Sequence, residues 1–210
     1  MNNYRDLVLA SESSRRREIL SLLGLPFRVL PSALDETALM AAFPSPDDAA
    51  TGLAAAKALE VAKTTAGAAV IGADTLVVLG DRALGKPRDA NEARQMLQRL
   101  RGKEHRVITG VAVASGTSLV ADMVSTRVWM RDFSDEEMER YIASGDPLDK
   151  AGAYAIQSEA FRPVARIEGC YLNVVGLPLC ITASLLNRAG YGISLAPFGS
   201  SPQECRYCAE

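Results

Sequence analysis

One stretch near the middle of the chain constrains the fold most strongly: residues 70–79, with the sequence VIGADTLVVL. Its length, its β-branched residues and its glycine borders predict a strand buried on both faces, inside a sheet covered by helices. Asp74 is the one charged residue in this run. Burying a carboxylate is costly unless a cation, a metal ion or a hydrogen-bond donor compensates its charge. Asp74 is therefore either a capping or turn residue where the strand breaks at Gly72, or part of a functional site.

Size and charge limit the classes of protein to which the chain can belong. Its 210 residues, 48% of them hydrophobic, suffice for one substantial core and are few for two, so we expect one α/β domain. The net charge of −2 and the pI near 5.6 argue against a general nucleic-acid-binding protein, because no overall positive field attracts phosphates. The first residues lead into an apolar strand, and no uncharged run has membrane-spanning length. We expect a cytoplasmic protein with no membrane partner.

The four cysteines and the single histidine give little support for a metal or nucleophilic centre. Cys170 and Cys180 stand among apolar residues and are predicted to be packing groups. Cys205 and Cys208 have the spacing of half a zinc site or of a redox pair, but no second half is present, which favours a chance pair in a loose tail. His105 precedes a strand pattern and is expected to be an ordinary strand-end residue.

A group of serines and arginines near the N-terminus predicts an anion site. A short strand over residues 7–10 leads into serines that suit the cap of a helix over residues 15–23. The first turn of that helix holds three consecutive arginines at the positive end of the helix dipole. They form either a solvated basic face or a phosphate site, and we favour the phosphate site because it explains both residue types. The phosphate-binding candidates here are Ser11, Ser13 and Arg16.

Three further segments contain charged residues that fit either a structural or a functional role. Glu36 lies in the sequence DET, which is either an acidic turn or a source of metal ligands. Lys57 lies in an alanine-rich helix, where the small neighbours suit an enclosed lysine as well as a solvated one. Residues 80–86 imitate the phosphate-loop pattern, but Pro87 replaces the serine or threonine that would hold magnesium, so we reject that assignment. Lys86 can still reach a phosphate as a point charge.

The rest of the chain predicts alternating strands and helices with an antiparallel section. Residues 146–159 suit a binding loop, and residues 191–210 lack periodicity and suit a loosely attached tail. Strands are predicted at residues 27–30, 106–114, 119–125 and 126–133, and helices at residues 89–100, 134–145 and 173–188.

These pieces, in this order, resemble the Maf family of nucleoside triphosphate pyrophosphatases, also called septum formation proteins. The resemblance covers residues 7–188 and rests on several collinear motifs. They are the serine-arginine segment at residues 11–16, DET at 35–37, GADT at 72–75, GKP at 85–87, GDPLDKAG at 145–152, IQ at 156–157 and NVVGLP at 173–178.

The resemblance implies an α/β fold of two lobes around an elongated, twisted mixed sheet, similar to that of inosine triphosphate pyrophosphatases. It implies one nucleotide pyrophosphatase domain over residues 1–190, followed by the tail, and a homodimer as a family-level expectation. The implied activity is hydrolysis of a nucleoside triphosphate to the monophosphate and pyrophosphate with a divalent cation, Mg²⁺ or Mn²⁺. The GADT and Tyr-x-Ile-Gln motifs resemble the branch that acts on dTTP and UTP.

Carried over position by position, the resemblance makes Asp74 the proton acceptor and assigns the base preference to Arg15, Thr75 and Gln157. One departure is that Ser158 and Glu159 follow Gln157, where the family usually has glycine. The Gln157 amide offers a donor and an acceptor, which match the edge of uracil or thymine, and its alternative role is a loop-stabilising hydrogen bond.

The expected chemistry needs cations that act on the charge of the leaving pyrophosphate. Arg15, Arg16, Lys57 and Lys86 can supply them. Glu36 and Asp74 are the predicted protein contacts of the divalent cation, with Asp74 taking a proton from a water that the cation has acidified. The alternative from another class is a nucleotide-sensing regulator of cell division that binds without turnover.

Overall fold

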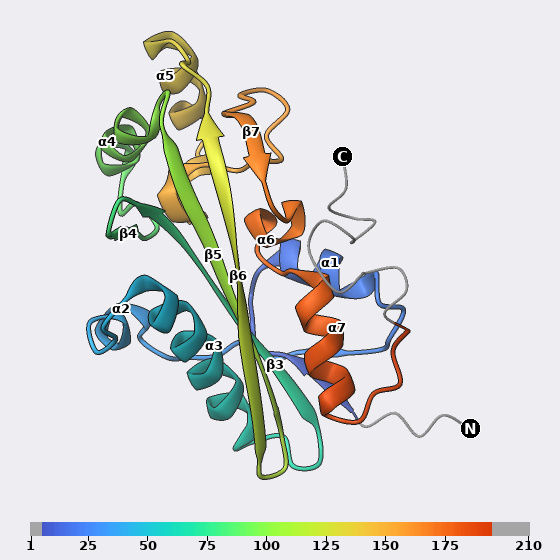
Figure 1. Cartoon of the computed structure of the whole chain (residues 1–210). Helices are drawn as coiled ribbons and strands as arrows, with labels where there is room; N and C mark the ends of the chain where they lie inside the picture. The colour runs from blue at the N-terminus through green and yellow to red at the C-terminus, as the bar shows by residue number, and fades with distance from the viewer. Residues whose placement is uncertain (1–5, 195–210) are drawn as a thin grey trace.

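A long mixed β-sheet forms the centre of the protein (Figure 1). The computed structural model describes residues 6–194. Its sheet has seven strands in the order β2-β1-β3-β5-β6-β7, with β4 paired to β3 outside this path. β1 pairs in parallel with β2 and β3, whereas all other pairs are antiparallel. The strands are β1 (Leu7–Leu9), β2 (Arg28–Val29), β3 (Ala69–Leu79), β4 (Arg82–Leu84), β5 (Glu104–Ser115), β6 (Ser118–Met130) and β7 (Val164–Glu168).

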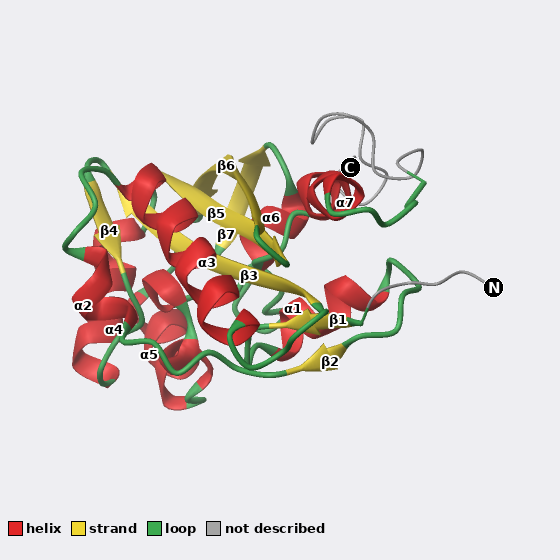
Figure 2. Cartoon of the chain, turned by 90° about the horizontal axis from the view of Figure 1, so that it is seen from below, coloured by secondary structure: helices red, strands yellow, loops and turns green. Residues whose placement is uncertain are grey.

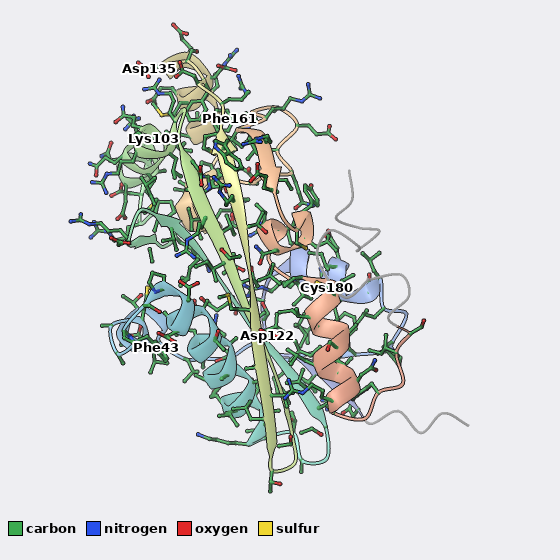
Figure 3. All side chains as sticks on the ribbon, in the orientation of Figure 1. Phe43, Lys103, Asp122, Asp135, Phe161 and Cys180 are labelled. Atoms are coloured by element: carbon green, nitrogen blue, oxygen red, sulfur yellow. The ribbon has the colours of Figure 1, made fainter. Side chains whose placement is uncertain are left out.

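Helices cover both faces of this sheet, which confirms the expected α/β class (Figure 2). On one face, alanines of α3 pack against β1, β3 and β5. On the other face, α1, α6 and α7 cover one half, and α4 and α5 cover the other. Figure 3 shows Cys180 in the first half and Phe161 in the second. The helices are α1 (Ser14–Ser21), α2 (Glu36–Met40), α3 (Pro46–Ala62), α4 (Ala90–Leu100), α5 (Asp135–Ala143), α6 (Tyr171–Val175) and α7 (Leu179–Arg188).

The central strand has a partner along nearly the whole of one edge and along a smaller part of the other. β5 pairs with β3 from Ala69 to Val78. On the opposite edge, β1 pairs with residues 69–71 and β4 pairs with residues 77–79. Among the described strands, none pairs with residues 72–76 on that edge. The strand itself does not break at Gly72, contrary to the first interpretation of Asp74; the interruption lies in its partners.

Two predicted elements are divided differently in the structure. The expected strands at residues 119–125 and 126–133 are one strand, β6, which keeps an unbroken register with β5. No glycine or proline interrupts the sequence around Ser125 and Thr126. The expected last helix is two helices, since Gly176 adopts a φ of 127° and ends α6. The predicted loop at residues 146–159 contains two short 3-10 helices, Asp146–Asp149 and Ala151–Ala153.

The start of the predicted tail is also packed. Tyr191 is only 3% exposed, and its hydroxyl donates to the carbonyl of Asp6 at 3.3 Å. The packed chain therefore extends past residue 190, whereas Cys205 and Cys208 lie outside the described residues. Cys170 and Cys180 are buried in the core, as predicted. Within residues 6–194, none of the helices combines the length and the apolar character that crossing a bilayer requires.

Candidate active site

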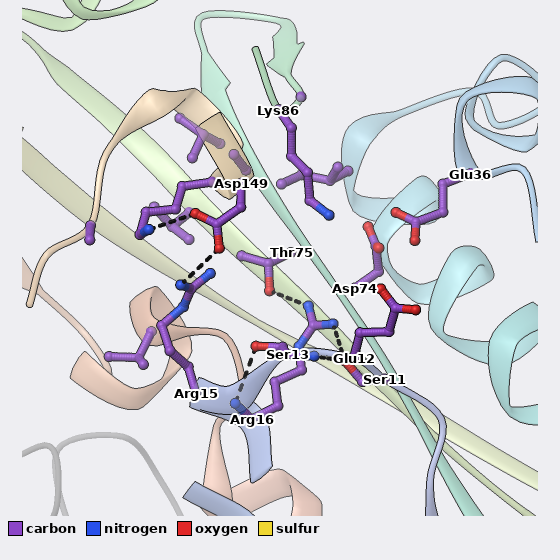
Figure 4. Close-up of a pocket in the computed structure, with 18 of the residues that line it drawn as sticks. Ser11, Glu12, Ser13, Arg15, Arg16, Glu36, Asp74, Thr75, Lys86 and Asp149 are labelled. Atoms are coloured by element: carbon purple, nitrogen blue, oxygen red, sulfur yellow. Dashed lines mark hydrogen bonds and ion pairs between the residues drawn. The ribbon is translucent and has the colours of Figure 1, made fainter. Parts of the chain in front are cut away.

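A cleft of about 780 Å³ opens where the edge of β3 lacks a partner (Figure 4). Adjacent residues of a strand point to opposite faces of the sheet, so Asp74 points toward α3 and Thr75 toward α1 and α6. Both reach one cleft because no strand separates the two faces at this edge. All ten residues selected from the sequence line the cleft: Ser11, Ser13, Arg15, Arg16, Glu36, Lys57, Asp74, Thr75, Lys86 and Gln157.

On the α3 side, the cleft contains a buried ionic cluster. The ammonium of Lys57 lies 2.6 Å from Oδ1 of Asp74 and 2.8 Å from Oε1 of Glu36. Lys57 is 5% exposed and Asp74 4% exposed, so the enclosed alternative for this lysine is the correct one. Partial burial raises the pKa of Glu36, but the hydrogen bond and charge of Lys57, with the charges of Lys86 and Arg16, outweigh it and hold the pKa below its ordinary value.

Two glycines in the sheet make this cluster possible. A Cβ atom on Gly72 would lie 2.1 Å from the carbonyl oxygen of Ala54, and one on Gly110 would lie 2.2 Å from that of Ala50. Both carbonyls belong to the backbone of α3. The helix therefore approaches the sheet more closely than any side chain at these two positions would allow. This close approach brings the Lys57 ammonium to the Asp74 carboxylate.

On the opposite side, Arg16 is held by neutral partners. Its Nε donates to the carbonyl of Gly176 at 2.9 Å, Nη1 to the hydroxyl of Ser11 at 3.2 Å, and Nη2 to the hydroxyl of Thr75 at 3.0 Å. The helix cap supports this position, because the Ser13 hydroxyl accepts from the backbone N–H of Arg16 at 3.3 Å. Burial lowers the pKa of Arg16, the charges of nearby carboxylates oppose that effect, and the guanidinium remains charged.

The loop after α5 lines a third side of the cleft. Nη1 of Arg15 lies 3.6 Å from Oδ2 of Asp149, and Nζ of Lys150 donates to the other Asp149 oxygen at 2.6 Å. Gln157 is exposed in this loop and faces the cleft. Lys86 points into the cleft from the segment after β4 (Figure 4). The basic groups at this site thus come from segments far apart in the sequence.

Sequence reasoning missed several residues that line or support the cleft. Glu12, an exposed acid between Ser11 and Ser13, lines the cleft (Figure 4), and nothing in the sequence pattern selected it. Tyr154 lines the cleft, and its hydroxyl lies 2.7 Å from Nε2 of His105. His105 is 2% exposed, and burial lowers its pKa to about 4. It is therefore a buried neutral partner of a cleft residue, and not an ordinary strand-end residue.

Two carboxylates of the cleft can be tested for their fit to a divalent cation. In the part of the chain that the structure describes, no three or more histidine, cysteine or acidic side chains are grouped to hold a metal ion. Glu36 and Asp74 supply hard carboxylate oxygens, and Lys57 contacts Oε1 of one and Oδ1 of the other. Mg²⁺ commonly uses one or two carboxylates together with substrate phosphates and water, so this donor set fits such an ion.

These features define an α/β protein with a cleft lined by both basic and acidic side chains. The chain belongs to the Maf family: the family described as "Maf-like protein" matches residues 6–189. A dTTP/UTP pyrophosphatase from Thermomicrobium roseum is 48% identical over 202 residues, covering 96% of this chain and 92% of the relative. One of the same name from Pelotomaculum thermopropionicum is 45% identical over 191 residues, covering 90% of this chain and 99% of the relative.

Among solved structures, a nucleoside-triphosphatase / dITP/XTP pyrophosphatase from Mycobacterium abscessus is similar in shape with a TM-score of 0.40 and 15% sequence identity. The match covers 61% of this chain and 75% of that chain. The likeness is partial, and it says nothing about the site.

Proposed function

We propose that this protein is a nucleoside triphosphate pyrophosphatase that hydrolyses dTTP and UTP to the monophosphate and pyrophosphate. The observation that carries the proposal is the buried Asp74 carboxylate, 2.6 Å from Lys57, in a cleft that also gathers Arg15, Arg16 and Lys86. A site that only bound the nucleotide would gain nothing from a carboxylate facing its phosphates. The family relatives named dTTP/UTP pyrophosphatase support the same activity.

In this proposal, the triphosphate lies along the basic residues of the cleft. The hydroxyls of Ser11 and Ser13 are close to the N-terminus of α1, where free backbone N–H groups favour an anion. Arg16 uses three of its N–H groups on protein acceptors, which leaves two of the five for phosphate oxygens. Lys86 approaches from the opposite wall and stabilises the charge that develops on the leaving pyrophosphate.

Asp74 is the proposed general base. A water molecule attacks the α-phosphorus, its proton passes to Asp74, and the bond from that phosphorus to the bridging oxygen breaks. The electron pair of that bond leaves with the pyrophosphate. Lys57 donates to Oδ1 and holds the carboxylate in place, so Oδ2 is the oxygen that accepts the proton.

We propose that Glu36 and Asp74 also hold a divalent cation, Mg²⁺ or Mn²⁺, together with the substrate phosphates. When bound, such a cation neutralises phosphate charge and lowers the pKa of water. The role of Lys57 is then to hold both carboxylates in place, at 2.8 and 2.6 Å.

The base is proposed to lie near Arg15, Thr75 and Gln157, at the end of the cleft formed by the loop after α5. Arg15 is held by Asp149 at 3.6 Å, so its guanidinium is oriented before a ligand arrives. The single domain over residues 1–190, the homodimer and the cytoplasmic location stay predictions.

The test is pyrophosphate release from a panel of canonical, methylated and otherwise modified nucleoside triphosphates, with Mg²⁺ or Mn²⁺. We expect release from dTTP and UTP, and none when the cation is chelated. Tight binding of these nucleotides without release of pyrophosphate from any of them would contradict the proposal. That outcome would favour the regulator that binds nucleotides without turnover.

A further inference from the structure

Behind Thr75 lies a buried network in which the orientation of one amide is fixed. Asn173 is 0% exposed; its Oδ1 accepts from the backbone N–H of Thr109 at 3.1 Å, and its Nδ2 donates to the carbonyl of Val107 at 2.8 Å. Nδ2 also donates to the hydroxyl of Thr126 at 2.9 Å. If the amide were rotated by half a turn, its NH₂ group would face the N–H of Thr109, and its oxygen would face the carbonyl oxygen of Val107. Only one orientation of Asn173 is therefore compatible with its surroundings.

The proton of the Thr109 hydroxyl has one position as well. Its Oγ1 lies 2.9 Å from the backbone carbonyl oxygen of Asn173, an atom that can only accept, so Thr109 donates there. A hydroxyl has a single proton. In the contact of 3.0 Å between the hydroxyls of Thr109 and Thr75, the donor must then be Thr75.

This order of donors determines what Thr75 can offer to a ligand. Its one proton is given to Thr109, and one of its two lone pairs accepts from Nη2 of Arg16 at 3.0 Å. A single lone pair remains. Toward the cleft, Thr75 is therefore a hydrogen-bond acceptor and cannot act as a donor.

We infer that Thr109 and Asn173 are positioning residues that make Thr75 an acceptor, and that the site thereby selects a pyrimidine with an N–H group at N3. Uracil and thymine carry that hydrogen. Cytosine has a lone pair at N3, which would be repelled by the lone pair of the Thr75 oxygen because neither atom supplies a proton. Gln157 cannot make this distinction alone, because its exposed amide can rotate to match either base. The inference rests on the proposed function and names the group that separates dTTP and UTP from dCTP.

The experiment compares kcat/KM for dTTP and dCTP in the natural protein, in Thr109→Val and in Thr109→Ser. Valine has the shape of threonine without the hydroxyl, so Thr75 regains a free proton that it can donate to cytosine. We expect the dTTP/dCTP ratio to fall about tenfold or more in Thr109→Val and to stay within about twofold of the natural ratio in Thr109→Ser. A purely structural role would lower both rates equally, because any misfolded fraction cancels in the ratio.

A parallel measurement separates this inference from the proposed activity. Calorimetry gives the affinities of the natural protein and of Thr109→Val for the α,β-methylene analogues of dTTP and dCTP, which bind without turnover. If the dTTP/dCTP affinity ratio shifts in Thr109→Val while the natural protein hydrolyses neither nucleotide, the proposed activity is contradicted and the inference is supported. An unchanged ratio in Thr109→Val, or equal use of dTTP and dCTP by the natural protein, would overturn the inference. Thr109→Ala, which also lacks the hydroxyl, replaces Thr109→Val if that variant does not fold.

Discussion

The two faces of β3 meet the cleft with different chemistry. On the α3 face, Asp74 takes part in an ionic cluster whose ammonium lies within 2.8 Å of two carboxylates. On the other face, Thr75 belongs to a network of hydroxyl, amide and backbone groups that contains one charged member, Arg16. Under the proposed function, this difference assigns separate tasks to the neighbouring residues Asp74 and Thr75. Charge favours proton transfer and phosphate chemistry, whereas neutral groups with fixed protons favour recognition of a base.

The largest expected effect comes from replacing the carboxylate on the charged face. Asp74→Asn should lower kcat about 10³-fold or more, because the amide cannot accept the proton from water. The fold should persist, since Lys57 keeps Glu36 as a partner at 2.8 Å. Pyrophosphate release and thermal unfolding measure the two quantities. Asp122→Asn, an exposed acid on β6, is the matched control, and an undiminished rate in Asp74→Asn would remove the chemical role from this face.

The second effect concerns stability. Lys57→Met should lower the free energy of unfolding by about 3 kcal/mol, because Asp74 and Glu36 would be left close together without their common cation. Lys63→Met, in the exposed residue that ends the same helix, should change it by less than about 0.5 kcal/mol. Urea unfolding monitored by circular dichroism gives both values. Equal midpoints for the two variants would mean that the cluster does not hold α3 against the sheet.

The third effect is a pH dependence that belongs to the neutral face. The pKa of His105 lies at about 4 in the fold, below its ordinary value of 6.5, so the unfolded chain binds a proton first as the pH falls. The stabilisation is complete above about pH 6.5 and is lost as the pH falls toward 4. Between pH 7.5 and pH 5, His105 should account for a loss of about 2 kcal/mol.

The matching measurement is urea unfolding of the natural protein and of His105→Gln at both pH values. The difference in the free energy of unfolding between the two proteins should shrink by that amount at the lower pH. A constant difference would show that His105 is not held neutral by burial beside Tyr154.

The smallest effect sets a baseline away from both faces. Arg94 pairs with Glu139 between α4 and α5, and the two side chains are 33% and 46% exposed. Arg94→Ala should lower the melting temperature only slightly, because water already screens the pair. Thermal unfolding at low and high salt measures it, and a cost equal to that of Lys57→Met would erase the distinction between the buried cluster and an ordinary surface ion pair.

The acid of the charged face could be predicted from the sequence, and the order of hydrogen-bond donors behind Thr75 could not. Asp74 can be recognised from the sequence, because it is the one acid in an apolar strand. The enclosure of Lys57 was undecidable, because it depends on how closely α3 approaches Gly72 and Gly110 in the folded sheet. Thr109 resembles any strand threonine. Its importance comes from a contact with Asn173, 64 residues away, which only the assembled fold creates.

The lack of a strand partner at residues 72–76 on one edge of β3 has a consequence for how such a site can evolve. Unpaired strand edges normally invite pairing with another chain, and here the unpaired stretch lies inside a cleft lined by side chains. Asp74 and Thr75, the proposed general base and the proposed recognition residue, are neighbours on β3, which pairs with β5 along its other edge. Substitutions in the surrounding helices can therefore adapt the cleft to a new ligand without changing the distance between Asp74 and Thr75.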